Sequence, residues 1–180
     1  AQREDVGAVT PCLLDRRGHV RHAGFAYPLT GFARCRQEGL KLGAGGYHIL
    51  LRQAHNVGAV SGVCFMIRRD HWLWMDESYH GGLGMVDFCI RLTREGLHHV
   101  YTPHGALVCR PSAWLLPGTR RDAEDLRRIQ TLYPSSEDPC YHPAFRRDRA
   151  DFRVTDQIRD IVKRRQEMTR AYAQSVGTGT

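Results

Sequence analysis

Apolar stretches in the N-terminal half of the chain follow the pattern of β-strands. Residues 6–14 (VGAVTPCLL) form an apolar run that ends in the turn-forming sequence DRRG, and such turns join antiparallel strands. Residues 20–27 (VRHAGFAY) are therefore predicted to pair back on this strand as a hairpin. Residues 57–69 (VGAVSGVCFMIRR) are almost continuously apolar, which is typical of a strand buried on both faces. Ser61 and Gly62 are expected to form a break inside it.

The segment 85–95 (MVDFCIRLTRE) has the periodicity of an amphipathic helix. At about 100° per residue its apolar side chains share one face and its charged side chains the other. Gly96 follows at the position where helices commonly end in a left-handed residue. Residues 97–102 and 105–109 are then predicted as two short strands that Pro103 separates. The helix is expected to pack on a sheet.

Two further charged segments, 119–132 and 155–173, are predicted as helices, with a Pro-rich turn at 135–143 between them. Residues 28–46 are rich in glycine and basic side chains and show no clear period. We expect a long loop there, and loops of that length are often functional. Because strands and helices alternate along the chain, the expected fold class is α/β, with a mixed sheet flanked by helices.

Composition narrows the function classes without choosing one. The chain has 180 residues with 42% hydrophobic content, which suffices for one folded domain. Its net charge of +7 favours an anionic partner such as a nucleotide diphosphate, a nucleic acid or an acidic membrane. No nucleic-acid-binding motif accompanies the charge, so we expect no nucleic-acid partner. No apolar run approaches the ~20 residues of a membrane span, and no signal-peptide pattern is present.

The six cysteines fall at wide spacings, without a CxxC pair or a Cys/His metal-ligand spacing. We interpret them as reduced and mostly buried thiols, which predicts a cytoplasmic protein. The chain begins with Ala-Gln-Arg rather than Met, so we expect it to be part of a longer protein.

Five ordered blocks of the sequence resemble one enzyme family. They are VGAVTPCLLDRRGHVRHAG (6–24), NVGAVSGVCFMIRR (56–69), MDE (75–77), VDFCIRLTREGLHHVYTPHGAL (86–107) and DPCYHP (138–143). In this order and at this spacing they are similar to the C-terminal half of family-two glycosyltransferases of the rhamnosyltransferase-like type. The resemblance runs from about residue 6 to about residue 152, and the order of five blocks is far more specific than any one block.

The resemblance implies a partial GT-A architecture, in which a nucleotide-sugar-binding half with an Asp-x-Asp metal motif precedes this segment. It implies a bacterial enzyme that transfers a sugar from a nucleotide-sugar donor to a growing cell-surface glycan or a lipid-linked acceptor. The preceding half of the same protein would then be a partner of this chain. A divalent metal, Mg²⁺ or Mn²⁺, is expected in the full-length protein, and none is expected to bind this chain alone.

Two positions depart from the family pattern. The family carries an acid just before the helix of 85–95, and that acid is the usual candidate for the general base. Gly84 and Met85 stand there in this chain, and a thioether cannot accept a proton in the reaction. The family also tends to carry a histidine where Cys109 and Arg110 stand, although Arg110 can hold a diphosphate oxygen by charge-assisted hydrogen bonds. The alternative function is therefore a catalytically degenerate module that acts as a binding or scaffold domain.

Three acids are candidate catalytic residues: Asp76, Glu77 and Asp87. Asp76 and Glu77 match the Asp-Glu pair of the family and are the nearest acids that can replace the missing base, with capping of a turn as the alternative. For Asp87 the alternative is a carboxylate in the first turn of the helix that pairs with Arg91 four residues on.

The candidate substrate-binding residues are Ser61, Gly62, Gly82, Gly84 and Arg110. Glycine allows a ligand to approach the backbone closely. The alternatives are a strand bulge at Ser61 and Gly62, and a flexible rim or an anion-binding helix start in the glycine loop. The exposed face of a tryptophan stacks on sugars, but Trp72 and Trp74 beside an apolar strand also fit a place in the core.

The last predicted helix is amphipathic and basic. Its apolar stripe contains Ile158, Ile161, Val162, Met168 and Tyr172, and its other faces carry Arg159, Lys163, Arg164 and Arg170. The stripe packs either on the body of the protein or its preceding half, or it attaches the protein to the anionic inner leaflet of the membrane. We therefore divide the chain into a body at 1–153, a helix at 154–174 and a frayed tail at 175–180.

Overall fold

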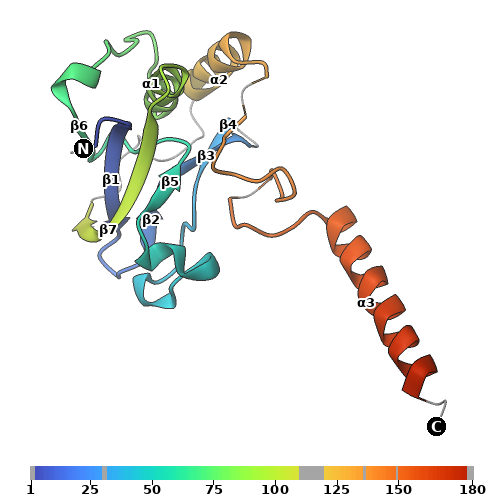
Figure 1. The fold of residues 1–180 in the computed structure, drawn as a ribbon. Coiled ribbons are helices and arrows are strands. Elements are labelled where there is room, and N and C mark those ends of the chain that lie inside the picture. The colour runs from blue at the N-terminus through green and yellow to red at the C-terminus, as the bar shows by residue number, and fades with distance from the viewer. Residues whose placement is uncertain (1–2, 30–31, 110–119, 136, 149, 178–180) are drawn as a thin grey trace.

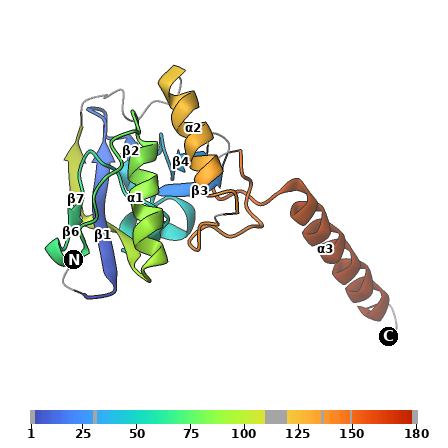
Figure 2. The same ribbon diagram turned by 90° about the horizontal axis from the view of Figure 1, so that it is seen from above.

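A computed structural model of the chain describes residues 3–29, 32–109, 120–135, 137–148 and 150–177. These residues form a mixed α/β fold with a curled mixed sheet (Figure 1). Helices α1 and α2 lie on one side of the sheet, with α1 nearer to it (Figure 2). The predicted α/β class is confirmed.

The main sheet has the strand order β2–β1–β7–β5. The long strands β1 (Val6–Leu14) and β7 (His98–Val108) lie parallel at its centre, and β5 (His55–Val57) pairs antiparallel with the far edge of β7. The other edge of β1 is shared by two short antiparallel strands, β6 (Met66–Ile67) and β2 (Val20–His22). The sheet is therefore mixed, as the sequence predicts.

The remaining elements are a small sheet and helices. Strands β3 (Phe25–Leu29) and β4 (Phe32–Cys35) form a separate two-stranded sheet. The helices are α1 (Leu83–Arg94), α2 (Arg120–Leu132) and α3 (Asp156–Gly177), and the 3₁₀ helices are η1 (Leu42–Ala44), η2 (Tyr47–Arg52) and η3 (Arg69–His71). Within the residues that the structure describes, no helix has both the length and the apolarity that crossing a bilayer requires.

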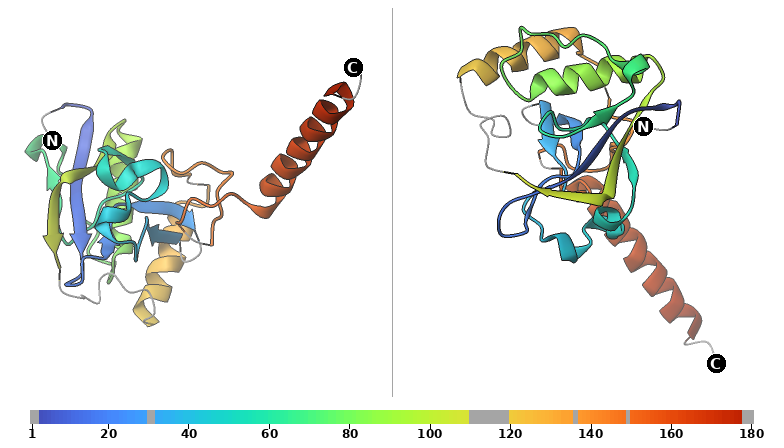
Figure 3. Two further views of the ribbon diagram at one scale, coloured as in Figure 1. Left: turned by 90° about the horizontal axis from the view of Figure 1, so that it is seen from below. Right: turned by 90° about the vertical axis from the view of Figure 1, so that its left-hand side faces the viewer.

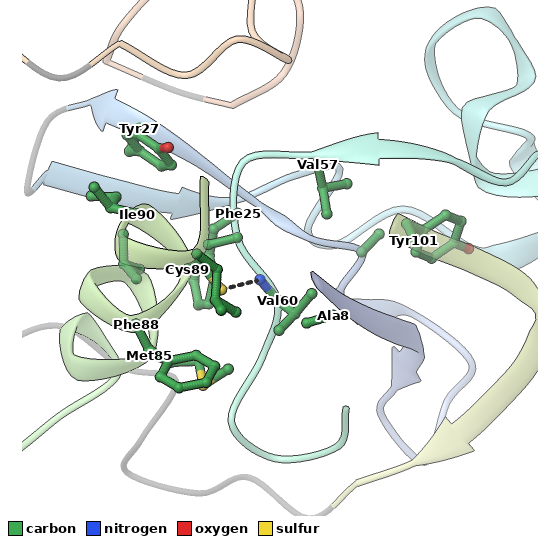
Figure 4. Close-up of a cluster of buried hydrophobic side chains, with 14 of the residues drawn as sticks. Ala8, Phe25, Tyr27, Val57, Val60, Met85, Phe88, Cys89, Ile90 and Tyr101 are labelled. Atoms are coloured by element: carbon green, nitrogen blue, oxygen red, sulfur yellow. Dashed lines mark hydrogen bonds between the residues drawn. The ribbon is translucent and has the colours of Figure 1, made fainter. Parts of the chain in front are cut away.

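Helix α1 supplies one wall of the core. Its predicted apolar face is buried, and it contacts β1, β7 and α2. Figure 4 shows this face, with Cys89 directed toward Val60 and Ile90 on the side of Tyr27 in β3. The backbone N–H of Val60 donates to Sγ of Cys89 at 3.5 Å, which ties the segment after β5 to the helix. Gly96, with φ of +83°, ends the helix as predicted.

The predicted hairpin strand at 20–27 is wrong in its second half. β2 does pair with β1, but the chain turns at Gly24, which has φ of +91°, and β3 then pairs with β4 instead. A Cβ on Gly24 would lie 2.5 Å from Cγ1 of Val57, so only glycine fits this close approach. β4 also falls inside the region 28–46 that we predicted to be a loop.

The long buried strand predicted at 57–69 is also wrong. Only its two ends belong to the main sheet. β5 pairs with β7, whereas β6 pairs with β1 along the edge of β1 that faces away from β7. Residues 58–65 must therefore cross from one side of the sheet to the other and cannot themselves be a sheet strand. Asp70, just beyond this segment, lies inside η3 and pairs with Arg68.

The two strands predicted on either side of Pro103 are one continuous strand, β7. Thr102 pairs with Pro11 and Ala106 with Cys12, so three residues of β7 bulge out of register. The bulge removes the need for a ladder hydrogen bond at Pro103, which explains why proline is tolerated in this strand.

Helix α3 stands away from the rest of the molecule, and all views agree on this (Figures 1–3). Its side chains are exposed from Asp156 to Met168, apart from a half-buried Ile158. Ile161 is 64% exposed and Met168 is 74% exposed. Packing of the apolar stripe on the body, one of the two predicted alternatives, is thus not found among the described side chains. The helix runs to Gly177, three residues beyond its predicted end.

Candidate functional site

A pocket of about 500 Å³ opens where the segment after β5, the residues before α1 and the first turn of α1 meet. Its lining contains six of the eight candidate site residues: Ser61, Gly62, Asp76, Glu77, Gly82 and Gly84. The structure therefore brings together two of the resembling sequence blocks, 56–69 and 75–77, and the glycine loop before α1.

The walls of the pocket are mostly apolar. Phe25, Val63, Met75, Tyr79 and Met85 supply them. Met85 is only 5% exposed and belongs to the hydrophobic core as well as to the pocket wall. A Cβ on Gly62 would meet Cγ and Sδ of Met85 at 3.8 Å, an ordinary contact, so packing does not demand glycine at position 62. Gly62 keeps the pocket wide instead.

Asp76 is held by two partners. The Arg128 guanidinium on α2 donates to it at 2.6 Å, and the hydroxyl of Ser78 donates at 2.6 Å. The hydrogen bonds from Ser78 and Arg128 lower the pKa of Asp76 to about 2. Its carboxylate also accepts the backbone N–H of Ser78 at 3.0 Å, so the turn-capping alternative describes what Asp76 does in the structure.

Glu77 differs from its neighbour. Its side chain is exposed at the pocket, and it forms no hydrogen bond or ion pair with any residue that the structure describes. A carboxylate without a partner is open to accept a hydrogen bond or a proton from a bound molecule. Of the pocket acids, Glu77 is the one whose oxygens are not already committed.

The glycine loop before α1 is fixed by Asp125 of α2. This buried carboxylate accepts the backbone N–H of His80 at 3.0 Å and that of Gly81 at 2.8 Å. The N–H of Gly84 and that of Met85 bond to carbonyls within the loop. These four amides are engaged within the protein and are not available to an anion. The loop is a rim held in place rather than a flexible one.

Gly84 is required by packing. A Cβ at this position would lie 2.9 Å from Cβ of Tyr79, closer than real side chains approach. Gly82, in contrast, is the N-cap residue of α1, with φ of −61°, and makes no side-chain cap. The two glycines therefore have different roles in the structure. Gly84 lets Tyr79 approach the backbone closely, and Gly82 borders the pocket.

Asp87 does not line the pocket. It is 2% exposed, and both its oxygens are engaged, since Tyr133 donates to Oδ1 at 2.7 Å and Arg91 donates to Oδ2 at 3.0 Å. The expected pair with Arg91 is thus present. The expected place in the first helical turn is wrong, because α1 begins at Leu83 and Asp87 falls in its second turn. This geometry supports a structural role for Asp87, which joins α1 to the residue after α2.

The last candidate, Arg110, lies outside the described residues. Among the residues that the structure does describe, no three His, Cys, Asp or Glu side chains come together to hold a metal ion. The described part of the chain therefore does not fit a divalent metal, and we derive no step through one. All six cysteines are free thiols, of which Cys12 and Cys89 are buried.

Sequence reasoning missed the contribution of α2. Asp125 holds the glycine loop, Arg128 holds Asp76, and Tyr133 just beyond the helix holds Asp87. Arg128 also lies over the ring of Tyr79 at 5.4 Å. The signal in the sequence was an acid and a base three residues apart on one face of a charged helix, but that pattern alone does not reveal a distant partner.

Comparison with known proteins adds one similarity. No family model matches the chain, and no solved structure matches it. The chain is 28% identical over 167 residues to the uncharacterized protein y4gI of Sinorhizobium fredii (strain NBRC 101917 / NGR234), a match that covers 84% of this chain and 18% of that protein. The chain thus spans less than a fifth of the length of this relative, whose description names no activity.

Proposed function

We propose that the chain is the acceptor-side part of a family-two, GT-A-like glycosyltransferase, and that the pocket takes the acceptor. One observation carries the proposal. Residues from two of the resembling sequence blocks, 56–69 and 75–77, line a single pocket together with the glycine loop, and this pocket includes an uncommitted carboxylate at Glu77. The donor would be a nucleotide sugar, and the acceptor a growing cell-surface glycan or a lipid-linked sugar.

The charges at the pocket favour a neutral acceptor over an anionic donor. Among the residues that the structure describes, its charged lining side chains are Asp76, which is paired with Arg128, and the unpaired Glu77. Carboxylates repel a diphosphate, whereas they accept hydrogen bonds from the hydroxyl groups of a sugar. The apolar walls suit the C–H faces of a sugar ring. The diphosphate of the donor would lie elsewhere, with Arg110 and the preceding half of the protein as its proposed ligands.

Glu77 is the proposed general base. Its carboxylate would take the proton of the acceptor hydroxyl while that oxygen forms a bond to the anomeric carbon of the donor sugar. The bond between the anomeric carbon and the diphosphate breaks, and the nucleoside diphosphate leaves with the electron pair. Asp76 is a poorer base, because its pKa of about 2 leaves it little tendency to take a proton at neutral pH. It would orient the acceptor and the loop.

The divalent metal of such enzymes would supply charge stabilisation of the leaving diphosphate. Because the described residues do not form a metal site, the proposal places it with the preceding half of the protein. The working location would be the cytoplasm, at the inner face of the membrane where lipid-linked acceptors are found.

A second candidate is a carbohydrate-binding or scaffold module without catalysis. Met85 favours it, since this buried thioether occupies the position at which the resembling enzymes carry an acid. Under this hypothesis the pocket binds a glycan and no proton is transferred.

Release of nucleoside diphosphate by the full-length protein, incubated with nucleotide sugars and neutral glycan acceptors, separates the two candidates. We expect turnover, and we expect Glu77→Gln to lower kcat by roughly a hundredfold or more, the usual contribution of a general base. Gly62→Ala is the matched pocket variant: its methyl group meets no close neighbour, so the fold should be retained while KM for the acceptor rises. Glycan binding without turnover would favour the binding module, and wild-type kcat in Glu77→Gln would refute the assigned base.

A further inference from the structure

The residues leading into the pocket acids present an exposed tryptophan. Trp72 is 45% exposed, but its ring packs 6.4 Å from that of Phe65 and 5.4 Å from that of Phe88 on α1. Trp74, two residues later, is 87% exposed. The core alternative that we gave for both tryptophans therefore has no support at Trp74.

Trp74 borders the pocket through the chain itself. The next three residues, Met75, Asp76 and Glu77, all line the pocket. Consecutive Cα atoms are about 3.8 Å apart, so the Cα atom of Trp74 lies next to the first of these lining residues, although Trp74 itself is not one of them. Val63 and Met75, which line the pocket, are 43% and 37% exposed. The exposed indole therefore belongs to the residue that directly precedes an apolar, partly exposed part of the lining.

This combination of groups matches the chemistry of a saccharide. An indole face packs against the C–H face of a sugar ring, and the free carboxylate of Glu77 accepts hydrogen bonds from hydroxyl groups at the ring edge. An anionic lipid surface is disfavoured at the same place, because the unpaired carboxylate of Glu77 would repel it, while the charge of Asp76 is offset by Arg128. A carbohydrate occupant therefore explains the exposed tryptophan better than a membrane does.

We propose that Trp74 is an outer saccharide subsite, whose indole stacks on the ring next to the one held in the pocket. The inference rests on the proposed function and deepens it, since it makes the acceptor a neutral oligosaccharide of at least two rings. Because the indole would contact only the second ring, its removal should weaken binding of a two-ring acceptor by roughly threefold to tenfold and leave a one-ring acceptor unaffected.

The binding test uses the indole N–H signals of the chain in NMR spectra. The chain has three tryptophans, so the signal of Trp74 is assigned by its loss in Trp74→Ala. A panel of neutral hexose and 6-deoxyhexose methyl glycosides, disaccharides and trisaccharides is titrated into the protein. We expect the Trp74 signal to shift with at least one disaccharide or trisaccharide and to shift less with the matching methyl glycoside. No shift of that signal with any sugar of the panel would overturn the proposal.

The kinetic test uses the full-length enzyme and compares acceptors of one and two rings. Trp74→Ala is expected to raise KM for the two-ring acceptor by roughly threefold to tenfold, with kcat unchanged. Met66→Ala is the control, since Met66 is 65% exposed on β6 but does not line the pocket. Turnover with the same KM in Trp74→Ala would refute the subsite while the proposed function stands. A sugar-dependent Trp74 signal in a protein without turnover would support the subsite and refute the transferase.

Discussion

Helices α1 and α3 are both amphipathic, but the apolar face of α1 is buried and that of α3 is exposed. In α1 the apolar stripe faces the sheet, and Ile90 is 3% exposed. In α3 the stripe faces away from any described partner, and Ile161 is 64% exposed (Figure 1). The same 3.6-residue periodicity thus marks a core helix in one place and an unpartnered helix in another. Periodicity shows that a helix has an apolar face, but it does not show what covers that face.

The contrast begins in the segment that leads to α3. Residues 138–152 are anchored to the body by a small aromatic cluster, in which the rings of Tyr47 and Phe152 stack at 4.9 Å and Arg36 lies over Phe152 at 4.7 Å. Near the end of this segment, just before the helix, Phe145 and Val154 form an isolated antiparallel β-bridge. Beyond Thr155 the chain leaves the body as a single helix (Figure 3).

A matched pair of isoleucine variants tests the contrast most directly. Ile90→Ala on α1 should lower the free energy of unfolding by about 2–5 kcal/mol, the usual cost of removing a buried isoleucine side chain. Ile161→Ala on α3 should change it by less than about 0.5 kcal/mol, as at other exposed positions. Urea denaturation of both variants and the wild type measures the difference.

Each variant controls for the other, since the substitution is chemically identical. Equal losses of stability would mean that the α3 stripe is covered in solution. A loss below about 1 kcal/mol for Ile90→Ala would mean that α1 is not the core helix that we describe.

The second prediction concerns the anchor between the two regions. Asp138 is 5% exposed, accepts the backbone N–H of Cys140 at 2.7 Å and that of Tyr27 at 3.4 Å, and faces Arg36. Burial raises its pKa from 3.8 to about 6. Because the pKa is higher in the folded state, the stability that the proton provides is complete below about pH 4 and is lost as pH rises through about 6. The loss between pH 4 and 7 should be about 2 kcal/mol.

Thermal or urea unfolding across that pH range, compared with Asp138→Asn, isolates this contribution. The amide cannot titrate, so we expect the difference in stability between the variant and the wild type to shift in favour of the variant as pH rises from 4 to 7. A difference that stays constant over this range would show that Asp138 has no raised pKa.

Much of the body could be predicted from the sequence, because its longest elements carry strong local patterns. The ranges 6–14 and 119–132 match β1 and α2 closely, and 85–95 matches α1 except for its first two residues and one extra residue at its end. The predictions are wrong where contacts between distant residues determine the path of the backbone. The turn at Gly24 depends on the approach of Val57, and the crossing at 58–65 depends on β5 and β6 pairing with different strands. Neither neighbour is visible in a local pattern.

The residues of the candidate site could likewise be predicted in part, but their interactions with distant residues could not. The resemblance led to Ser61, Gly62, Asp76 and Glu77, which do share a pocket. The difference in availability between the two acids could not be predicted, because it depends on Arg128, more than fifty residues away in the sequence. The burial of Asp87 likewise follows from Tyr133, a residue that no spacing rule connects to it.

The smallest effect on stability is expected from removing α3 altogether. A version that ends at Thr155 keeps the bridge of Val154 and the hydrogen bond from Thr155 N–H to the carbonyl of Ala144. No other described element packs closely on α3. The melting temperature of the shortened protein should therefore stay within about 2 °C of that of the full chain. A larger fall would place the helix against the body in solution.

The same pair of proteins tests the membrane alternative for α3. Between Asp156 and Met168 the helix carries four basic and three acidic side chains, a net charge of +1, so the attraction to an anionic surface is only about 1 kcal/mol. Insertion of Ile161, Val162 and Met168 would add to it. We expect the full chain to partition onto anionic vesicles at least about fivefold more strongly than the shortened one. Raised salt should weaken only the electrostatic part. Equal partition of both proteins would remove the membrane as the partner of α3 and would leave another protein surface, such as the preceding half of the same protein, to cover the stripe.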